Sequence, residues 1–204
     1  NNTFVLMPKD LVKQCEPLPT HSKLLILGAG FSGQRVAALA RKLGTNVICT
    51  RRRVDNSGAD YIFDSLKNEI PPQNSLSGVT HVLSCIPPDP NGKDPVLQTL
   101  KSNLYRMPLK WIGYLSTTGI YGDSQGKWVS EHDAPNPQLL RSKRRLLCEK
   151  KWQELGLPVQ ILRLPGIYGP GRSAIDMVKA GRARMIDKPG QIFSRIHVED
   201  IAGA

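Results

Sequence analysis

Three glycines, at positions 28, 30 and 33, are spaced in a way that indicates a binding site. They follow the apolar run 24–27 and have the form G-x-G-x-x-G. In this pattern the first glycine permits a tight turn, the second lets the backbone approach a pyrophosphate, and the third lets helix and strand pack closely. Residues 31–43 then have helical spacing, so a helix N-terminus would face the phosphates. The motif predicts a dinucleotide-binding turn made of Gly28, Gly30, Phe31, Ser32 and Gly33; the alternative is a purely structural glycine turn.

The next expected strand, residues 46–50, ends at Arg51, Arg52 and Arg53. About 20 positions beyond such glycines, a side chain meets the adenosine ribose of the dinucleotide. An NAD site favours a carboxylate there, whereas guanidinium groups suit a 2′-phosphate through charge-assisted hydrogen bonds. We therefore expect NADP rather than NAD, bound by Arg51 and Arg52, although some of these arginines could be plain solvated charges.

The composition sets limits on the class of protein. The chain has 204 residues, of which 40% are hydrophobic and 6% aromatic, and this is enough for one globular core. No apolar run approaches the roughly 20 residues of a membrane span. A cytoplasmic protein without a membrane partner is therefore expected. The net charge of +11 raises the possibility of a nucleic-acid partner, but no nucleic-acid-binding motif accompanies it, so this class is disfavoured.

Cysteines and histidines do not indicate a metal or a disulfide framework. The four cysteines, at positions 15, 49, 85 and 148, are widely spaced, and two of them lie in expected buried strands. The four histidines form no H-x-x-x-H or Cys/His cluster. No metal site is therefore expected.

Strand and helix patterns alternate from Lys23 onward. Further strands are expected at 60–63, 79–86, 110–116 and 158–163, with helices between most of them. This alternation predicts an α/β fold with a doubly wound parallel sheet of the Rossmann type. We divide the chain into an N-terminal arm (1–22), an NAD(P)-binding domain (23–170) and the start of a small, incomplete C-terminal substrate-binding part (171–204). The proline-rich loop 87–95 is either a lid or an ordinary surface loop.

Two later segments add more specific signatures. Residues 113–123 read Gly-Tyr-Leu-Ser-Thr-Thr-Gly-Ile-Tyr-Gly-Asp, and residues 161–171 read Ile-Leu-Arg-Leu-Pro-Gly-Ile-Tyr-Gly-Pro-Gly. Together with the glycine motif, and in this order, they resemble the extended short-chain dehydrogenase/reductase superfamily, of the NAD(P)-dependent epimerase/dehydratase type. The resemblance covers residues 23–204.

This resemblance implies roles for several residues. Thr117, four residues before Tyr121, lies at the family's catalytic Ser/Thr position, and the neighbouring Ser116 could also hydrogen-bond to a substrate. Asp64 would lie near the adenine. The remaining cofactor contacts would come from Ile86 and Pro87, which border the cofactor, and from the nicotinamide side, lined by Pro165, Gly166 and Ile167. Family dimers often pair through the helices after the fourth and fifth strands, so a homodimer is a possible assembly.

The family's acid/base motif, Y-x-x-x-K, is missing. In that motif the lysine lowers the pKa of the tyrosine electrostatically. If Lys143 is the family lysine, Leu139 replaces the tyrosine; if the spacing to Glu149 sets the register, Arg145 replaces the lysine and Arg141 the tyrosine. The pattern is similar to the atypical branch of the superfamily.

The missing tyrosine leaves the proton donor and the function open. Tyr121, Tyr168 and His197 are candidate substitutes, although each could be structural. An arginine at 141 or 145 could bind an anionic substrate or stabilise an oxyanion, or could simply be solvated. The first hypothesis is an NADP-dependent oxidoreductase or epimerase-like enzyme for a small polar or nucleotide-linked substrate. The second is a catalytically silent module that senses NADP(H) and regulates a partner protein.

Overall fold

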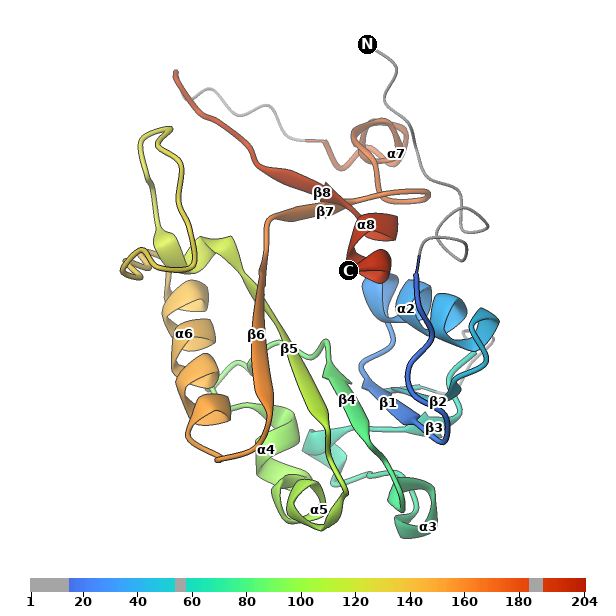
Figure 1. Ribbon diagram of the computed structural model, residues 1–204. Coiled ribbons are helices and arrows are strands. Elements are labelled where there is room, and N and C mark those ends of the chain that lie inside the picture. The colour runs from blue at the N-terminus through green and yellow to red at the C-terminus, as the bar shows by residue number, and fades with distance from the viewer. Residues whose placement is uncertain (1–14, 54–57, 184–188) are drawn as a thin grey trace.

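A six-stranded parallel sheet forms the centre of the molecule (Figure 1). The computed structural model describes residues 15–53, 58–183 and 189–204. The strand order is β3-β2-β1-β4-β5-β6, so the direction of winding reverses between β1 and β4. Parallel strands in this order form a doubly wound Rossmann sheet, which confirms the expected fold class. The strand bounds are β1 Lys23–Leu27, β2 Asn46–Arg51, β3 Tyr61–Ile62, β4 His81–Ser84, β5 Trp111–Thr117 and β6 Val159–Leu164.

Helices cover the sheet on both faces because side chains of β1 alternate between them. Leu24 and Ile26 lie in the cluster that includes Ala37 of α2, while Leu25 and Leu27 lie in the cluster formed with α4, α5 and α6. All four leucine and isoleucine side chains are buried, as expected of a strand covered on both faces. The helices are α2 Phe31–Lys42, α3 Gln73–Leu76, α4 Pro95–Thr99, α5 Lys101–Arg106 and α6 Leu140–Gln153, with short 3-10 turns at Ser65–Lys67 (η1) and Thr118–Tyr121 (η2).

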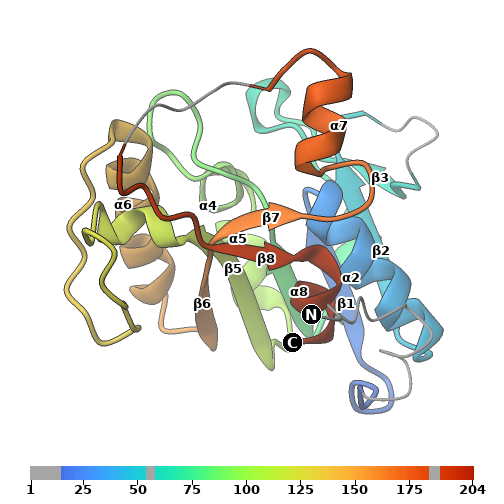
Figure 2. The same cartoon turned by 90° about the horizontal axis from the view of Figure 1, so that it is seen from above.

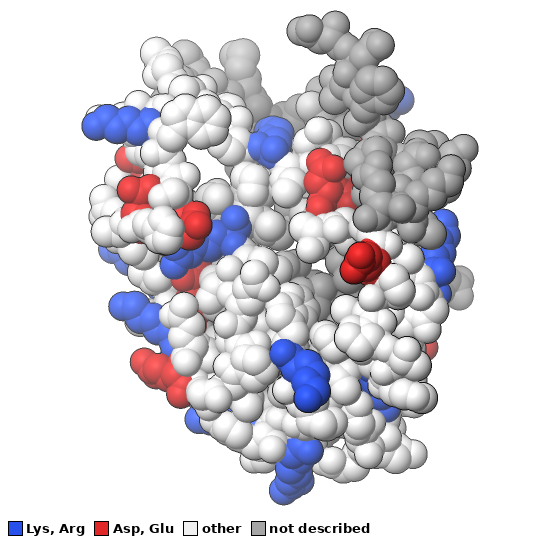
Figure 3. All heavy atoms as spheres, viewed as in Figure 1, with Lys and Arg blue, Asp and Glu red and all other residues white. Residues whose placement is uncertain are grey.

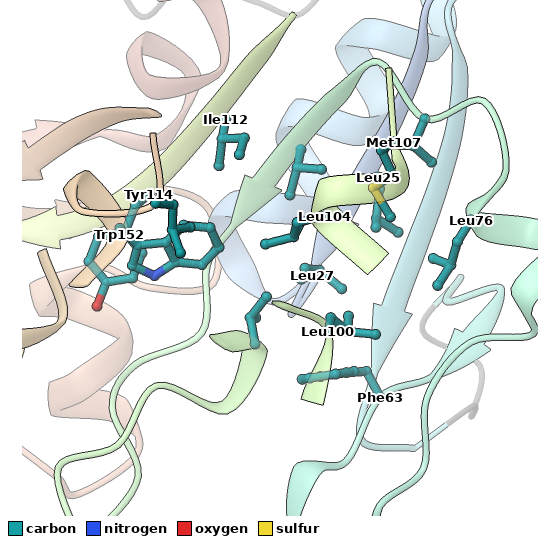
Figure 4. Close-up of a cluster of buried hydrophobic side chains, with 14 of the residues drawn as sticks. Leu25, Leu27, Phe63, Leu76, Leu100, Leu104, Met107, Ile112, Tyr114 and Trp152 are labelled. Atoms are coloured by element: carbon teal, nitrogen blue, oxygen red, sulfur yellow. The ribbon is translucent and has the colours of Figure 1, made fainter. Parts of the chain in front are cut away.

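Trp152 of α6 anchors the larger core cluster (Figure 4). Its ring stacks on Tyr114 of β5 with 5.7 Å between ring centroids. Its indole Nε1 donates a 2.8 Å hydrogen bond to Oδ2 of Asp94, whose other oxygen caps the N-terminus of α4. Burial raises the pKa of Asp94, and the Trp152 hydrogen bond opposes this effect. One indole thus fixes α6 against both the sheet and α4.

A second, two-stranded sheet lies beyond β6. It pairs β7 (Gly166–Tyr168) with β8 (Arg195–His197) and precedes α8 (Val198–Gly203), while α7 (Ala174–Lys179) lies between the two strands in sequence. Figures 1 and 2 both show α8 beside α2, and Arg35 of α2 forms a 3.3 Å ion pair with the buried Glu199. One strand of this small sheet, β7, lies in the expected NAD(P)-binding domain (23–170), and the other, β8, lies in the expected C-terminal part (171–204).

Several expected segments differ in detail from the structure. The strand expected over 60–63 is only two residues long, because the Asp60 carboxylate instead accepts hydrogen bonds from the Cys49 backbone and the Arg41 side chain. The strand expected over 79–86 ends at Ser84, and Ile86 packs against the glycine turn. Of the N-terminal arm, residues 1–14 lie outside the described residues, and Cys15 donates from Sγ to the carbonyl of Gly203 at 3.5 Å.

The loop 87–95 is compact. The Asp89 carboxylate accepts hydrogen bonds from the backbone of Asn91 and Lys93, and Gly92 approaches the side chain of Arg144 on α6. The loop thus packs against α6 next to Arg144.

The four cysteines are unpaired, and the described residues contain no group of histidine, cysteine and acidic side chains that could hold a metal. Within the same residues, no helix is long and apolar enough to cross a membrane.

Replacing Trp152 by phenylalanine should lower the free energy of unfolding by about 2 kcal/mol, because a buried hydrogen bond to Asp94 is lost. The matched control is Trp128→Phe, since Trp128 is fully exposed and should change stability by less than about 0.5 kcal/mol. Urea unfolding of both variants checks this. Equal effects would contradict the anchoring role of Trp152.

Candidate functional site

The glycine turn joins β1 to α2 under tight steric limits. Gly28 has φ +77°, and a Cβ at this position would lie 2.7 Å from Cγ1 of Ile86. A Cβ at Gly33 would lie 3.1 Å from Ile26 and 3.4 Å from the sulfur of Cys85. A Cβ at Gly30, by contrast, would have only the Gly28 carbonyl oxygen within 4 Å, at 3.9 Å. Gly28 and Gly33 are therefore required by packing, whereas Gly30 leaves open space beside the turn.

This open space lies at the N-terminus of α2. Gly30 is the N-cap residue and supplies no side chain to cap the first turn, which contains no acidic residue. The N-terminal backbone amides and the helix dipole favour an anion there. Phe31, the first helical residue, is half-buried, and the guanidinium of Arg172 lies 5.3 Å from its ring centroid. The turn thus has the shape and electrostatics that a pyrophosphate requires.

The end of β2 is fastened to the same turn. Thr50 accepts hydrogen bonds from the backbone amides of Gly28 (at Oγ1, 3.3 Å) and Ala29 (at its carbonyl, 2.8 Å). Arg51 follows directly and is half-buried, while Arg52 is exposed. Among the described residues neither has an acidic partner. The structure therefore brings cationic groups next to the glycine turn, at the edge where an adenosine ribose would lie.

A large cleft opens at the carboxyl edge of β4 and β5. Its volume is about 1750 Å³, which exceeds the few hundred to about 1000 Å³ typical of small-molecule sites. Figure 1 shows both the loop after η2 and the segment leading into β8 above the end of β5. Its walls come from loop 87–90, η2 with the following loop, the start of α6, and residues 189–194.

The three candidate catalytic residues occupy different positions. Thr117 lines the cleft, and its Oγ1 accepts a 3.0 Å hydrogen bond from the Gly119 amide. Ser116 is buried below the cleft surface and donates a short hydrogen bond to Glu149. Lys143 is exposed on α6 and is not among the residues that line the cleft. Of these three residues, only Thr117 lines the cleft.

Glu149 is the centre of a buried polar network that the sequence did not indicate. It is 1% exposed, accepts from Ser116, and pairs with Arg163 of β6 at 2.8 Å. Arg163 also donates to the Tyr121 hydroxyl at 2.8 Å. The hydrogen bond to Glu149 raises the pKa of Arg163, so the guanidinium stays charged. The network fixes α6 to the ends of β5 and β6, directly under Thr117.

The positions of side chains on α6 bear on the two possible registers of the missing motif. Arg141 and Arg145 both line the cleft, as does Leu139, whereas Lys143 does not. In the register set by Glu149, the tyrosine and lysine positions are Arg141 and Arg145, and both side chains line the cleft. In the register set by Lys143, only Leu139, at the tyrosine position, lines it. Arg145 is held by a 2.7 Å hydrogen bond to the carbonyl of Leu115.

The three candidate substitutes for the missing tyrosine differ in whether they line the cleft. Tyr121 lines the cleft and its hydroxyl accepts from Arg163. His197 caps α8 by accepting from the Glu199 amide, and its ring packs edge-to-face on Tyr168 at 5.0 Å. Neither His197 nor Tyr168 lines the cleft, so both have structural roles here.

Three of the remaining candidate cofactor residues lie at the turn or the cleft, and the other three lie elsewhere in the fold. Ile86 contacts Gly28, and both Pro87 and Pro165 line the cleft. Gly166 and Ile167 lie in β7, while Asp64 caps η1 by accepting from the Leu66 amide. Arg172, which sequence reasoning missed, lines the cleft and packs on Phe31, so it lies between the cleft and the glycine turn.

Replacing Glu149 by glutamine should lower the free energy of unfolding by about 3 kcal/mol, because the largely buried Arg163 would lose its charged partner. Glu154→Gln is the control, since Glu154 is the exposed C-cap residue of α6 and its substitution should hardly change the free energy of unfolding. Thermal or urea unfolding distinguishes the two. A Glu149 variant as stable as the control would show that the network does not hold α6 in place.

Comparison with known proteins places this fold. A scan against models of protein families and a search of curated proteins found no match. Among solved structures, a conserved protein of unknown function from Silicibacter pomeroyi is 40% identical, with a TM-score of 0.74 over 89% of this chain and 65% of that one. The chain thus spans slightly less than two thirds of that structure.

Two further structures share the fold. A provisionally assigned NAD-dependent epimerase/dehydratase from Methylobacillus flagellatus is 25% identical, with a TM-score of 0.67 over 90% of this chain and 68% of that one. A UDP-glucuronic acid 4-epimerase from Bacillus cereus, solved with UDP-glucuronic acid and NAD, is 19% identical, with a TM-score of 0.67 over 88% of this chain and 70% of that one. The chain therefore shares the fold of solved proteins of the NAD-dependent epimerase/dehydratase type, in line with the resemblance of its motifs.

Proposed function

We propose that the chain forms the cofactor site and the catalytic cleft of an NADP(H)-dependent oxidoreductase or epimerase-like enzyme for a small polar or nucleotide-linked substrate. The observation that carries this proposal is the position of Thr117 in a large cleft, at the same sheet edge as the glycine turn. Ligands of open α/β sheets bind at this edge, where the winding reverses. NAD-bound neighbours with the same fold support a nicotinamide dinucleotide.

The residues present suit such a cofactor. Gly30 leaves room for a pyrophosphate, and the N-terminus of α2 offers it backbone amides. Arg51 and Arg52 would hold a 2′-phosphate, because planar guanidinium groups pair with phosphate oxygens through two parallel hydrogen bonds. The bound cofactor would donate or accept a hydride at the substrate carbon.

The cleft residues would then handle the substrate oxygen. Thr117 already accepts a hydrogen bond from Gly119, so its own O–H can be donated to a carbonyl oxygen. Reduction of that carbonyl consumes one hydride and one proton, and oxidation releases both. Thr117 would hold the oxygen in place by donating its hydroxyl proton to it in a hydrogen bond. Tyr121, whose hydroxyl binds Arg163, is the phenol of the cleft wall from which a proton could be exchanged.

Replacing both Arg51 and Arg52 by alanine should raise the Kd for NADP by at least about tenfold, because charge-assisted hydrogen bonds to the 2′-phosphate are lost. The Kd for NAD should change much less. Calorimetric titration of both cofactors measures this, with the double variant Lys101→Ala/Arg106→Ala on α5 as a control that also removes two positive charges. Equal losses for NADP and NAD would contradict the 2′-phosphate role.

Replacing Thr117 by valine should lower turnover by about 100-fold, as expected for removal of a hydrogen-bond donor to a reacting oxygen, and leave NADPH binding unchanged. NADPH consumption with a panel of carbonyl compounds and sugar nucleotides supplies the assay, and Ser116→Ala is the neighbouring control. Wild-type protein that binds NADPH but consumes none with any panel member would favour the alternative, a module that senses NADP(H) for a partner protein.

A further inference from the structure

The cleft carries positive charge without acidic partners. Arg141, Arg144, Arg145 and Arg172 all line it, and within the described part of the chain none of them forms an ion pair with a carboxylate. Of the two acidic residues in the lining, Asp89 binds the backbone of its own loop and Asp123 accepts from the Gln125 amide. Guanidinium groups gathered in one cleft repel one another, so the arrangement favours an anionic ligand.

Helix α6 begins with charges of the unfavourable sign. Its first turn contains Arg141 and Lys143 and no acidic residue, and its N-cap, Leu139, provides no side-chain hydrogen bond. Cations at a helix N-terminus oppose the helix dipole, which favours anions there. Such a sequence reduces the stability of the isolated helix, and an anion bound beside it would reverse that effect.

Ser142 supplies an independent indication of a ligand. It is 3% exposed, lines the cleft, and its Oγ lies 3.0 Å from where a Cβ on Gly119 would be. Its Oγ makes no hydrogen bond to another described residue, and it is not fully buried, because Ser84 Oγ is the one fully buried side-chain oxygen without a partner in that part of the chain. A hydroxyl that reaches the cleft in this way can bond to a ligand that enters between η2 and α6.

Contacts with β5 hold the side chain of Arg145 in place beside the cleft. Its Nη1 donates to the Leu115 carbonyl at 2.7 Å, and its guanidinium lies 5.7 Å from the centroid of the Tyr114 ring. Arg141 lies one turn earlier on the same face of α6, and residues four apart on a helix are neighbours. Arg141, Ser142 and Arg145 thus all line the cleft from the first half of α6, and a Cβ on Gly119 would lie 3.0 Å from Ser142 Oγ and 3.3 Å from Thr117 Oγ1.

We propose that Arg141, Ser142 and Arg145 bind an anionic group, a carboxylate or phosphate, on the reacting end of the substrate, an inference that rests on the proposed function. The anion would accept hydrogen bonds from both guanidinium groups and from the Ser142 hydroxyl. This group is separate from any nucleotide diphosphate, because it lies next to Thr117, where the substrate carbon reacts. The substrate class is then a small acid or an acidic sugar derivative.

The test compares two ligands that differ only in this group. UDP-glucuronic acid and UDP-glucose, each titrated into protein saturated with NADP, differ by a carboxylate in place of a hydroxymethyl group. We expect the acid to bind at least about tenfold more tightly. Arg141→Gln should abolish the difference, while Lys143→Gln, which removes the same charge from the same helical turn but lies outside the cleft, should retain it.

Inorganic phosphate is the second probe and does not depend on a nucleotide-linked substrate. Phosphate should bind to wild-type protein and to Lys143→Gln, and more weakly to Arg141→Gln and Ser142→Ala. Phosphate binding that is equal in all four proteins, or absent from the wild type, would overturn the inference. Titration of NADP alone is the control for the proposed function: it should be the same in all four proteins, and its absence from the wild type would contradict the cofactor site instead.

Discussion

The close packing of the glycine turn against the neighbouring strand is the constraint on which the rest of the structure depends. A side chain at Gly28 would collide with Ile86, and one at Gly33 would press on Ile26 and Cys85. With a side chain at either glycine, α2 could not pack this closely on the sheet. The N-terminus of the helix would then not meet the ends of β1 and β4. Because the winding of the sheet reverses between these two strands, the same contacts determine where a ligand can lie.

Helix α6, on the opposite wall of the site, carries partnered polar groups in one half and arginines that face the cleft in the other. In the second half of α6, Glu149 pairs with Arg163 and accepts from Ser116, and Trp152 binds Asp94, so each buried polar group named here has a partner. In its first half, Arg141 and Arg145 face the cleft without carboxylate partners among the described residues. The stable half thus holds in place the half that would bind a ligand. Figure 3 shows the face viewed in Figure 1, where Lys and Arg side chains lie at several separate places, with acidic groups among them in the upper part.

Much of the fold could be predicted from the sequence because its signals are local. The apolar run at 24–27 predicts a buried strand, and positive φ at Gly28 follows from the motif. The Glu149 network could not be predicted, because it joins residues 116, 149 and 163 from three elements. Nor could the sequence decide between the two registers on α6. That choice depends on which side chains face the cleft, and only packing determines this.

Calorimetric titration of the purified chain with NADP, NADPH, NAD and NADH tests the central claim most directly. The glycine turn and the arginines after β2 predict binding of NADP and NADPH, with a clear loss of affinity for NAD and NADH, which lack the 2′-phosphate. Failure to bind any of the four would contradict the account, because the turn would then serve only to pack α2 against the sheet.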